Sequence, residues 1–153
     1  MAITINDSCT GCTACVRACP VAAISGARSQ RHRIDPSRCI GCGACGRVCP
    51  VSAVLDSEGR AIVRLKRAAW MQPAFDLASC IGCACCVAAC PVECLVMEGG
   101  QPGGLGETPH LAKPETCVSC ELCVEICPVD CVVMGSGIPV GKADGNAAGE
   151  GAA

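Results

Sequence analysis

The fold is decided by a twelve-residue stretch, Cys9-Thr-Gly-Cys12-Thr-Ala-Cys15-Val-Arg-Ala-Cys19-Pro20. Its spacing, C-x2-C-x2-C-x3-C-P, returns three more times along the chain, in stretches that run from Cys39 to Pro50, from Cys80 to Pro91 and from Cys117 to Pro128. These four repeats use sixteen of the 19 cysteines in a chain of 153 residues. Runs of this kind hold iron–sulfur cubanes through their thiolates, whereas zinc sites use cysteine pairs and need neither the third cysteine nor the proline. The sequence therefore predicts four [4Fe-4S] clusters.

The repeats resemble the bacterial 2[4Fe-4S] ferredoxins, doubled in tandem over residues 1–135. The resemblance implies that the first three cysteines of a repeat bind one cluster and the fourth binds the cluster of the neighbouring repeat. Spacing alone would also allow other partners. The implied ligand sets are Cys9, Cys12, Cys15 and Cys49 for cluster one; Cys39, Cys42, Cys45 and Cys19 for cluster two; Cys80, Cys83, Cys86 and Cys127 for cluster three; and Cys117, Cys120, Cys123 and Cys90 for cluster four.

The repeats come as two pairs, which predicts an α+β chain of two tandem ferredoxin-like domains with short strands and short helices around the clusters. We place the domains at residues 1–60 and 73–135, with a linker at 61–72 and a flexible tail at 136–153. The chain has one Trp, one Phe and no Tyr. Domains of about 60 residues are marginally stable without additional cross-links, so we expect the clusters to stabilise each domain.

Each repeat is expected to form a strand, a cluster loop, a short helix from the third cysteine and a further strand. Glycine precedes the second cysteine in three loops, and Ser119 takes that place in the fourth. Glycine allows a turn with positive φ that aims backbone N–H groups at the cluster. The expected strands are Ile3–Ile5, His32–Asp35, Ala53–Asp56, Ala74–Leu77, Leu95–Glu98, His110–Lys113 and Val132–Met134.

Three cysteines lie outside the ligand pattern. Cys94 and Cys131 stand four residues after the last ligand of repeats three and four, where the first two repeats have alanine. This exchange favours a buried, small hydrophobic role and leaves a ligand or redox role as the alternative. Cys85 could replace its neighbour Cys86 as a ligand, but the register of the other loops favours Cys86.

Charge divides the chain into two unlike parts. Residues 1–69 carry ten Lys or Arg and four Asp or Glu, a net charge of +6, whereas residues 70–153 carry two and ten, a net charge of −8. The basic half lacks the interleaved aromatic residues of a nucleic-acid site, so we expect no nucleic-acid partner. Opposite charges suit two different protein partners, or head-to-tail self-association into filaments.

The segment Gly59–Ser79 joins the two halves and contains both aromatic residues, Trp70 and Phe75. Ile62, Leu65 and Ala69 stand at helical spacing in it. One interpretation is a connector whose apolar side plugs the seam between the domains. The other is an anchor for a partner protein.

Electron transfer is the function that these features favour. We find no catalytic constellation, no dinucleotide fingerprint, no signal peptide and no membrane span, and we expect a cytoplasmic protein that is not itself an enzyme. The resemblance implies a wire subunit of an anaerobic oxidoreductase complex. It would connect a tungsten- or molybdenum-pterin aldehyde or formate oxidoreductase to a flavoprotein. The alternatives are a free polyferredoxin shuttle and an iron–sulfur storage or assembly protein.

Overall fold

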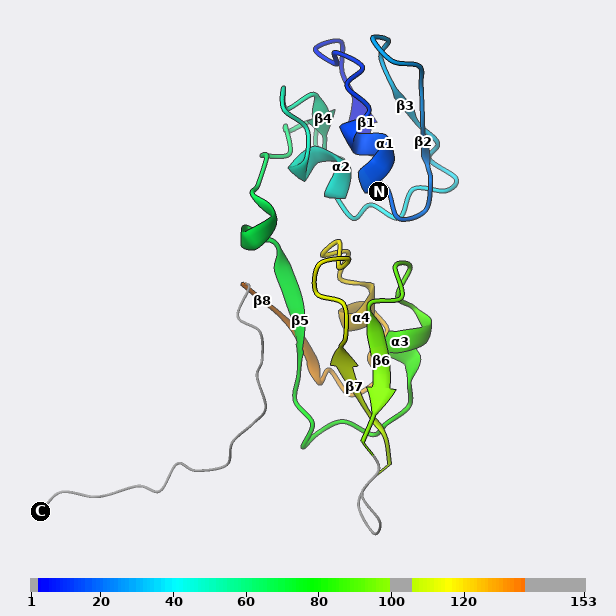
Figure 1. Cartoon of the computed structure of the whole chain (residues 1–153), viewed down its shortest axis with the longest axis vertical. Helices are drawn as coiled ribbons and strands as arrows, with labels where there is room; N and C mark the ends of the chain where they lie inside the picture. Colours follow the sequence, from blue (N-terminus) through cyan, green and yellow to red (C-terminus); the bar gives the residue numbers. More distant parts are fainter. Residues whose placement is uncertain (1–2, 100–105, 137–153) are drawn as a thin grey trace, which may run out of the picture.

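The computed structural model describes residues 3–99 and 106–136, which form two halves stacked along the long axis of the molecule (Figure 1). Both halves have the same order of elements, strand–helix–strand–strand–helix–strand, so the α+β class is confirmed. The first half contains β1 (Thr4–Ile5), α1 (Ala14–Ala18), β2 (Ile24–Ser25), β3 (Arg33–Ile34), α2 (Ala44–Arg47) and β4 (Val54–Leu55). The second contains β5 (Met71–Phe75), α3 (Cys85–Ala88), β6 (Leu95–Glu98), β7 (Thr108–Leu111), α4 (Leu122–Glu125) and β8 (Val132–Ser136).

Each half pairs its outer strands with each other and its inner strands with each other, always antiparallel. β1 pairs with β4 and β2 with β3 over two residues each, whereas β5 pairs with β8 over five and β6 with β7 over four. The first and last segments of each half therefore lie side by side. The helices of the two repeats in each half also contact each other, α1 with α2 and α3 with α4, and this brings their cysteines together.

The second half contains the four strands that were predicted, whereas the first half contains four strands where three were predicted. β6 has the predicted bounds Leu95–Glu98, and β5 begins three residues before the predicted Ala74 because its ladder with β8 continues through Pro73 and Met71. The strand Ile24–Ser25 was not predicted, since two residues are too few to show an alternating pattern. Residues 137–153, which carry most of the predicted tail, lie outside the described residues.

Cysteines form a large share of both hydrophobic cores. In the first half, Ile5 and Val54 pack with the buried Cys15, Cys45 and Cys49. In the second half, the half-buried Phe75 and Val124 pack against a buried core. The buried residues of this core are Cys86, Cys94, Leu95, Cys117, Cys123, Cys131 and Val132. Because so few large side chains are available, the stability of each half depends on what its cysteines bind.

The seam between the halves is filled by Trp70, which is 4% exposed. Its ring packs with Ala44 of α2 and with Val118 from the last cysteine loop. The guanidinium of Arg67 lies 4.2 Å from the ring centroid, and that of Arg47 lies 5.5 Å from it. The seam interpretation is therefore confirmed for Trp70.

The seam interpretation is wrong for Phe75, and the helical spacing in the connector does not produce an α-helix. Phe75 packs against the core of the second half, and the connector contains only a 3-10 turn at Arg67–Ala69. Ile62 instead extends the first half, because its N–H donates to the carbonyl of Val54.

No helix in the described ranges is long and apolar enough to cross a membrane.

Candidate metal centres

Each cysteine loop contains three residues in the left-handed region, at equivalent places in all four repeats. The first precedes the second cysteine: Gly11, Gly41 and Gly82 have φ of 67°, 72° and 67°, and Ser119 follows with 52°. The second precedes the helix, and the third follows the Pro-Val pair; these residues are Thr13, Gly43, Ala84 and Glu121, then Ala22, Ser52, Glu93 and Asp130. Eight of these twelve positions, Ser119 among them, carry a residue other than glycine. The left-handed conformation costs such residues energy unless the surroundings enforce it.

Glycine is required sterically at the first of these positions. A Cβ built on Gly11 would lie 2.4 Å from the backbone nitrogen of Gln30. Ser119 adopts the same conformation in the fourth loop, where its hydroxyl donates to the carbonyl of Met71. Serine therefore adopts the same turn as glycine at this position.

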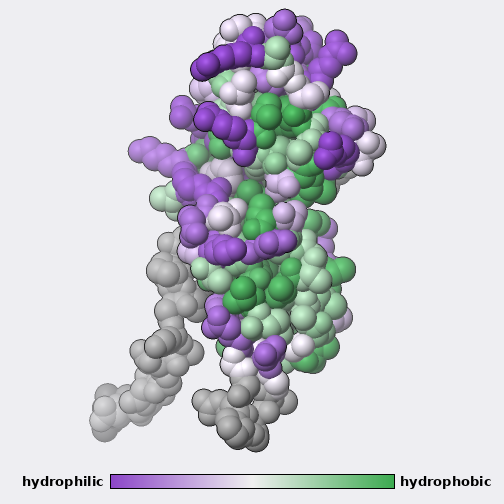
Figure 2. Space-filling view, turned by 45° about the vertical axis from the view of Figure 1, so that its right-hand side comes forward, coloured by the Kyte–Doolittle hydropathy of each residue, from purple (hydrophilic) through white to green (hydrophobic). Residues whose placement is uncertain are grey.

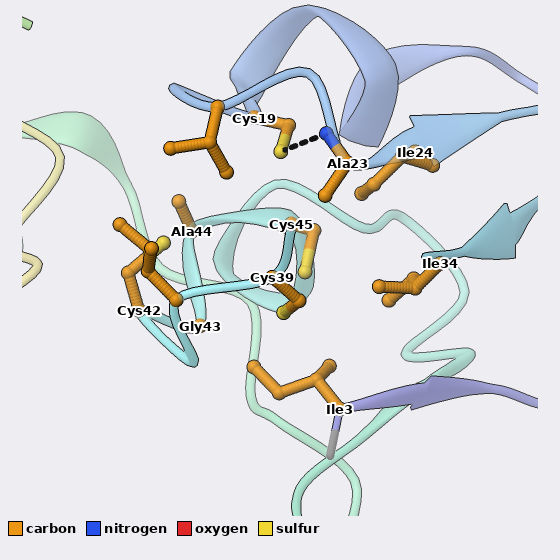
Figure 3. Close-up of a pocket in the computed structure, with 12 residues that line it drawn as sticks. Ile3, Cys19, Ala23, Ile24, Ile34, Cys39, Cys42, Gly43, Ala44 and Cys45 are labelled. Carbon is orange, nitrogen blue, oxygen red and sulfur yellow. Dashed lines mark hydrogen bonds between the residues drawn. The ribbon is translucent and has the colours of Figure 1, made fainter. Parts of the chain in front are cut away.

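In the first half, two cavities each bring four predicted ligands together. One is lined by the thiols of Cys9, Cys12, Cys15 and Cys49. The other is lined by the thiols of Cys19, Cys39, Cys42 and Cys45 (Figure 3). In each cavity the fourth thiol comes from the other repeat, and Figure 3 shows Cys19 facing Cys39, Cys42 and Cys45 across the space between them.

The second half repeats this arrangement. One cavity is lined by the predicted ligands of the fourth set, Cys90, Cys117, Cys120 and Cys123, together with Cys94. For the third set, the side chain of Cys131 hydrogen-bonds both Cys127 and Cys80, so these two predicted ligands lie close to the same thiol. Cys83 and Cys127 both act electrostatically on Cys85, so they too are neighbours.

The donor set of each cavity fits a cubane. Within residues 3–99 and 106–136, no three His, Cys, Asp or Glu side chains converge closely enough to bind one metal ion. The thiols instead surround a shared space, which suits a cubane because each thiolate binds a different iron. Backbone amides are also aimed at the sulfurs: the N–H of Ala23 donates to Cys19 Sγ at 3.2 Å, and that of Ala53 to Cys49 Sγ at 3.3 Å.

Burial controls the protonation of these thiols. Desolvation raises the pKa of Cys45 to about 12, and the thiols of Cys42, Cys39 and Cys15 add to the rise. Desolvation likewise raises the pKa of Cys123 to about 12. Both thiols are protonated at neutral pH in the metal-free chain, so cluster binding must displace their protons.

Packing and electrostatics agree on which thiol sets are neighbours, since Cys15 and Cys45 share the first core, and Cys86 and Cys123 share the second. Cys15 of the first set acts on Cys45 of the second, and Cys86 of the third set acts on Cys123 of the fourth. Between the halves, desolvation raises the pKa of Cys120, and the thiol of Cys42 adds to the rise. The second and fourth sets therefore meet at the seam.

Two residues near the centres lie outside the predicted ligand sets. His32 is 1% exposed, its Nδ1 lies 3.9 Å from Cys9 Sγ, and its Nε2 is buried without a hydrogen-bond partner in the described chain. Arg47 crosses the seam and donates from Nη1 to the carbonyl of Val118 at 3.0 Å. Its position two residues after Cys45 indicates that it lies near a cluster. The sequence gives no indication of its hydrogen-bond partner, which lies 71 residues away.

The three additional cysteines all contact predicted ligands. Cys94 hydrogen-bonds Cys117, and this contact lowers the pKa of Cys117 to about 6. Desolvation, followed by hydrogen bonds to Cys127 and Cys80, raises the pKa of Cys131 to about 12. The prediction that Cys94 and Cys131 are buried is confirmed, since they are 2% and 5% exposed. Cys85 is half-buried, whereas Cys86 belongs to the core.

Two family models match this chain, and both are described as a 4Fe-4S dicluster domain. One matches residues 8–53 and 79–131, once in each half. The other matches residues 38–95, which contain the second and third repeats. No curated protein sequence matches the chain.

Solved structures give a more distant likeness. One is a chain of the formate dehydrogenase–heterodisulfide reductase–formylmethanofuran dehydrogenase complex from Methanospirillum hungatei, with 20% sequence identity and a TM-score of 0.43. The alignment covers 92% of this chain and 53% of that chain, so the present chain spans about half the length of its structural neighbour.

Proposed function

The chain belongs to the family of 4Fe-4S dicluster domains, and on that premise we propose that it holds four [4Fe-4S] clusters and conducts electrons between two redox partners. The observation that carries the proposal is the continuity of the four thiol sets. The thiols of the two sets in each half share one core, and Cys42 of the second set and Cys120 of the fourth both pack against the cluster around Trp70 at the seam. The bound clusters would supply the one-electron chemistry.

We assign the ligands in crossed sets. The cavities support this assignment, because three of them collect the first three cysteines of one repeat and the fourth cysteine of the other. The sets are Cys9, Cys12, Cys15 and Cys49; Cys39, Cys42, Cys45 and Cys19; Cys80, Cys83, Cys86 and Cys127; and Cys117, Cys120, Cys123 and Cys90. Domain boundaries at residues 1–60 and 73–135 agree with this pairing, since each crossed set stays within one half.

The route that follows runs through the clusters in the order one, two, four, three. Electron-transfer rates fall steeply with distance, so the contact between the second and fourth sets is the step that joins the halves. At this contact Trp70 packs with Val118 and Ala44, and Arg47 donates a hydrogen bond across the seam to the carbonyl of Val118. The chain's own residues therefore hold the two thiol sets against each other.

The two ends of this route present different surfaces. On the face seen in Figure 2, hydrophilic residues gather over the first half, and hydrophobic residues are more widespread on the second. Their charges are opposite in sign, since residues 1–69 carry a net charge of +6 and residues 70–153 a net charge of −8. Unlike ends favour a cytoplasmic wire subunit, without catalysis of its own, placed between a tungsten- or molybdenum-pterin aldehyde or formate oxidoreductase and a flavoprotein.

Isolation of the native protein from its own cells under anaerobic conditions tests this proposal. We expect about sixteen iron and sixteen sulfide per chain, co-purification with a catalytic oxidoreductase subunit identified by mass spectrometry, and spin coupling between clusters in reduced samples. Iron near eight per fully folded chain would refute the four-cluster assignment. A stable monomer that reduces several unrelated enzymes would favour a free shuttle, and ready transfer of clusters to apo-proteins would favour a storage role.

Head-to-tail association is a second arrangement that the charge distribution supports. A basic face that docks on an acidic face of the next copy is a heterologous contact, which closes into a ring or continues as a filament. Such a contact between exposed charges should weaken as salt rises. Light scattering at low and high salt tests it, with charge reversal at Arg64 and Lys66; a single small particle under all conditions would exclude filaments.

A further inference from the structure

The position four residues after the last ligand lies directly over that ligand's sulfur. In three repeats, the backbone N–H at this position donates to the ligand Sγ, so the side chain begins next to the same atom. The donor and ligand pairs are Ala23 with Cys19 at 3.2 Å, Ala53 with Cys49 at 3.3 Å and Cys131 with Cys127 at 3.4 Å. Whatever side chain stands here must meet a cluster ligand.

In the second half this side chain is a thiol in both repeats. Cys94 Sγ lies 3.4 Å from Cys90 Sγ, and Cys131 Sγ lies 3.5 Å from Cys127 Sγ. Each thiol also hydrogen-bonds a second ligand of the same proposed set, since Cys94 contacts Cys117 and Cys131 contacts Cys80. Both thiols thus lie between two ligands of one cluster.

Each of these sulfur–sulfur contacts is a hydrogen bond, so one of the two sulfurs must carry the proton. A cysteine that binds iron does so as a thiolate and has no proton to give, whereas the additional cysteine is free to donate its S–H. Both proposed ligand sets are complete without it. The first half has only a methyl group at this place, at the buried Ala23 and Ala53.

We propose that Cys94 and Cys131 are thiol donors that raise the reduction potentials of clusters four and three, respectively. The proposal rests on the cluster assignment made above. One-electron reduction by an external reductant adds negative charge to a cluster and its thiolates. A hydrogen bond to a ligand sulfur therefore stabilises the reduced form more than the oxidised form.

The donors would offset the charge of their own half. Residues 70–153 carry a net charge of −8, which disfavours the reduced clusters and lowers their potentials. Two buried S–H groups act on the ligands directly and are not screened by salt as exposed carboxylates are. The consequence is a second half whose potentials lie closer to those of the basic first half than charge alone would give.

Anaerobic potentiometric titration of the full-length, cluster-loaded chain, monitored by electron paramagnetic resonance, tests this. Cys94→Ala should shift one of the four transitions to lower potential, and Cys131→Ala should shift a different one. The expected size is about tenfold in the ratio of reduced to oxidised cluster at a fixed potential, or roughly 59 mV for one electron. Iron and sulfide should stay at the wild-type content in both variants.

Two matched variants separate hydrogen bonding from packing. Cys94→Ser keeps a donor and should not show the shift of the alanine variant, and Ala23→Cys adds a donor beside Cys19 and should raise the potential of cluster two. Unchanged titrations in both alanine variants would overturn the proposal, and so would loss of iron in Cys94→Ala, which would make Cys94 a ligand. A wild-type iron content far below sixteen would instead refute the four-cluster assignment, so the two failures are distinguishable.

Discussion

The two halves share one arrangement of cysteines but surround it with different residues. The strands of the first half pair over two residues each, and those of the second over five and four. The first half is basic with alanine beside its crossing ligands, and the second is acidic with thiols there. The comparison teaches that the cysteine spacing determines where clusters bind, while neighbouring residues are free to vary stability and potential.

The largest expected effect comes from breaking ligand sets in pairs. If the sets are crossed, Cys19→Ala combined with Cys39→Ala disables one cluster, and about four iron per chain are lost. Cys19→Ala combined with Cys9→Ala then disables two clusters, and about eight iron are lost. Iron analysis of soluble, anaerobically purified protein measures the difference. The reverse order of these losses would mean that each repeat supplies all four ligands of its own cluster.

The same design applied to the second half tests whether the halves are equivalent. Cys90→Ala with Cys117→Ala should cost about four iron, and Cys90→Ala with Cys80→Ala about eight. If the first half shows crossing and the second does not, Cys94 or Cys131 has entered a ligand set. In that case the equivalence of the halves fails at the thiols that distinguish them.

Removing the aromatic ring from the seam should separate the halves. Trp70 packs against residues of both, and truncation of a buried aromatic residue costs about 3–5 kcal/mol. We expect Trp70→Ala to weaken spin coupling between clusters two and four and to expose the connector to proteolysis. Phe75→Ala is the control, because its ring packs only within the second half; equal proteolysis in both variants would contradict a seam role for Trp70.

A smaller effect is expected from Arg47. Its Nη1 donates across the seam to the carbonyls of Val118 and Ser119, at 3.0 Å and 3.5 Å. Loss of a charged donor to a buried carbonyl costs about 1–3 kcal/mol, so Arg47→Ala should lower the free energy of unfolding by that amount. The matched control is Arg17→Ala, at the equivalent place in α1, for which the described residues show no hydrogen bond across the seam. Equal destabilisation would argue against the seam contact.

The smallest effect concerns backbone protection in the intact protein. Local opening is easier where few hydrogen bonds must break together. Amides of β1 and β4 should therefore exchange with deuterium faster than those of β5 and β8, as measured by hydrogen exchange with mass spectrometry under anaerobic conditions. Equal protection would mean that the clusters, and not the strand ladders, determine the stability of both halves.

The sequence alone was sufficient for the cofactor type and the class of fold. Both follow from a fourfold spacing that chance does not produce, and the left-handed conformation at Gly11 and its equivalents follows from the loop geometry. The bounds of short strands could not be obtained in this way. The pair Ile24–Ser25 is held by its partner strand and by contacts to the core, and two residues carry no periodic signal.

The seam and the thiol contacts were also beyond the reach of the sequence. Arg47 and Val118 are 71 residues apart, and nothing local connects them. The exchange of alanine for Cys94 and Cys131 indicated burial correctly, but not that each thiol lies against a ligand sulfur. Such contacts depend on how the repeats fold back on each other, which spacing within one repeat does not specify.

The seam is built from the cofactor-binding loops themselves. Val118 and Ser119 stand between two predicted ligands of cluster four, and Arg47 follows a predicted ligand of cluster two by two residues. A chain damaged by oxygen at either of these clusters would therefore lose more than one electron carrier: its loops would relax, and the two halves would begin to tumble independently. Overall rigidity thus reports on cofactor integrity, and a partner or protease that senses shape could distinguish intact chains from damaged ones without any contact to iron.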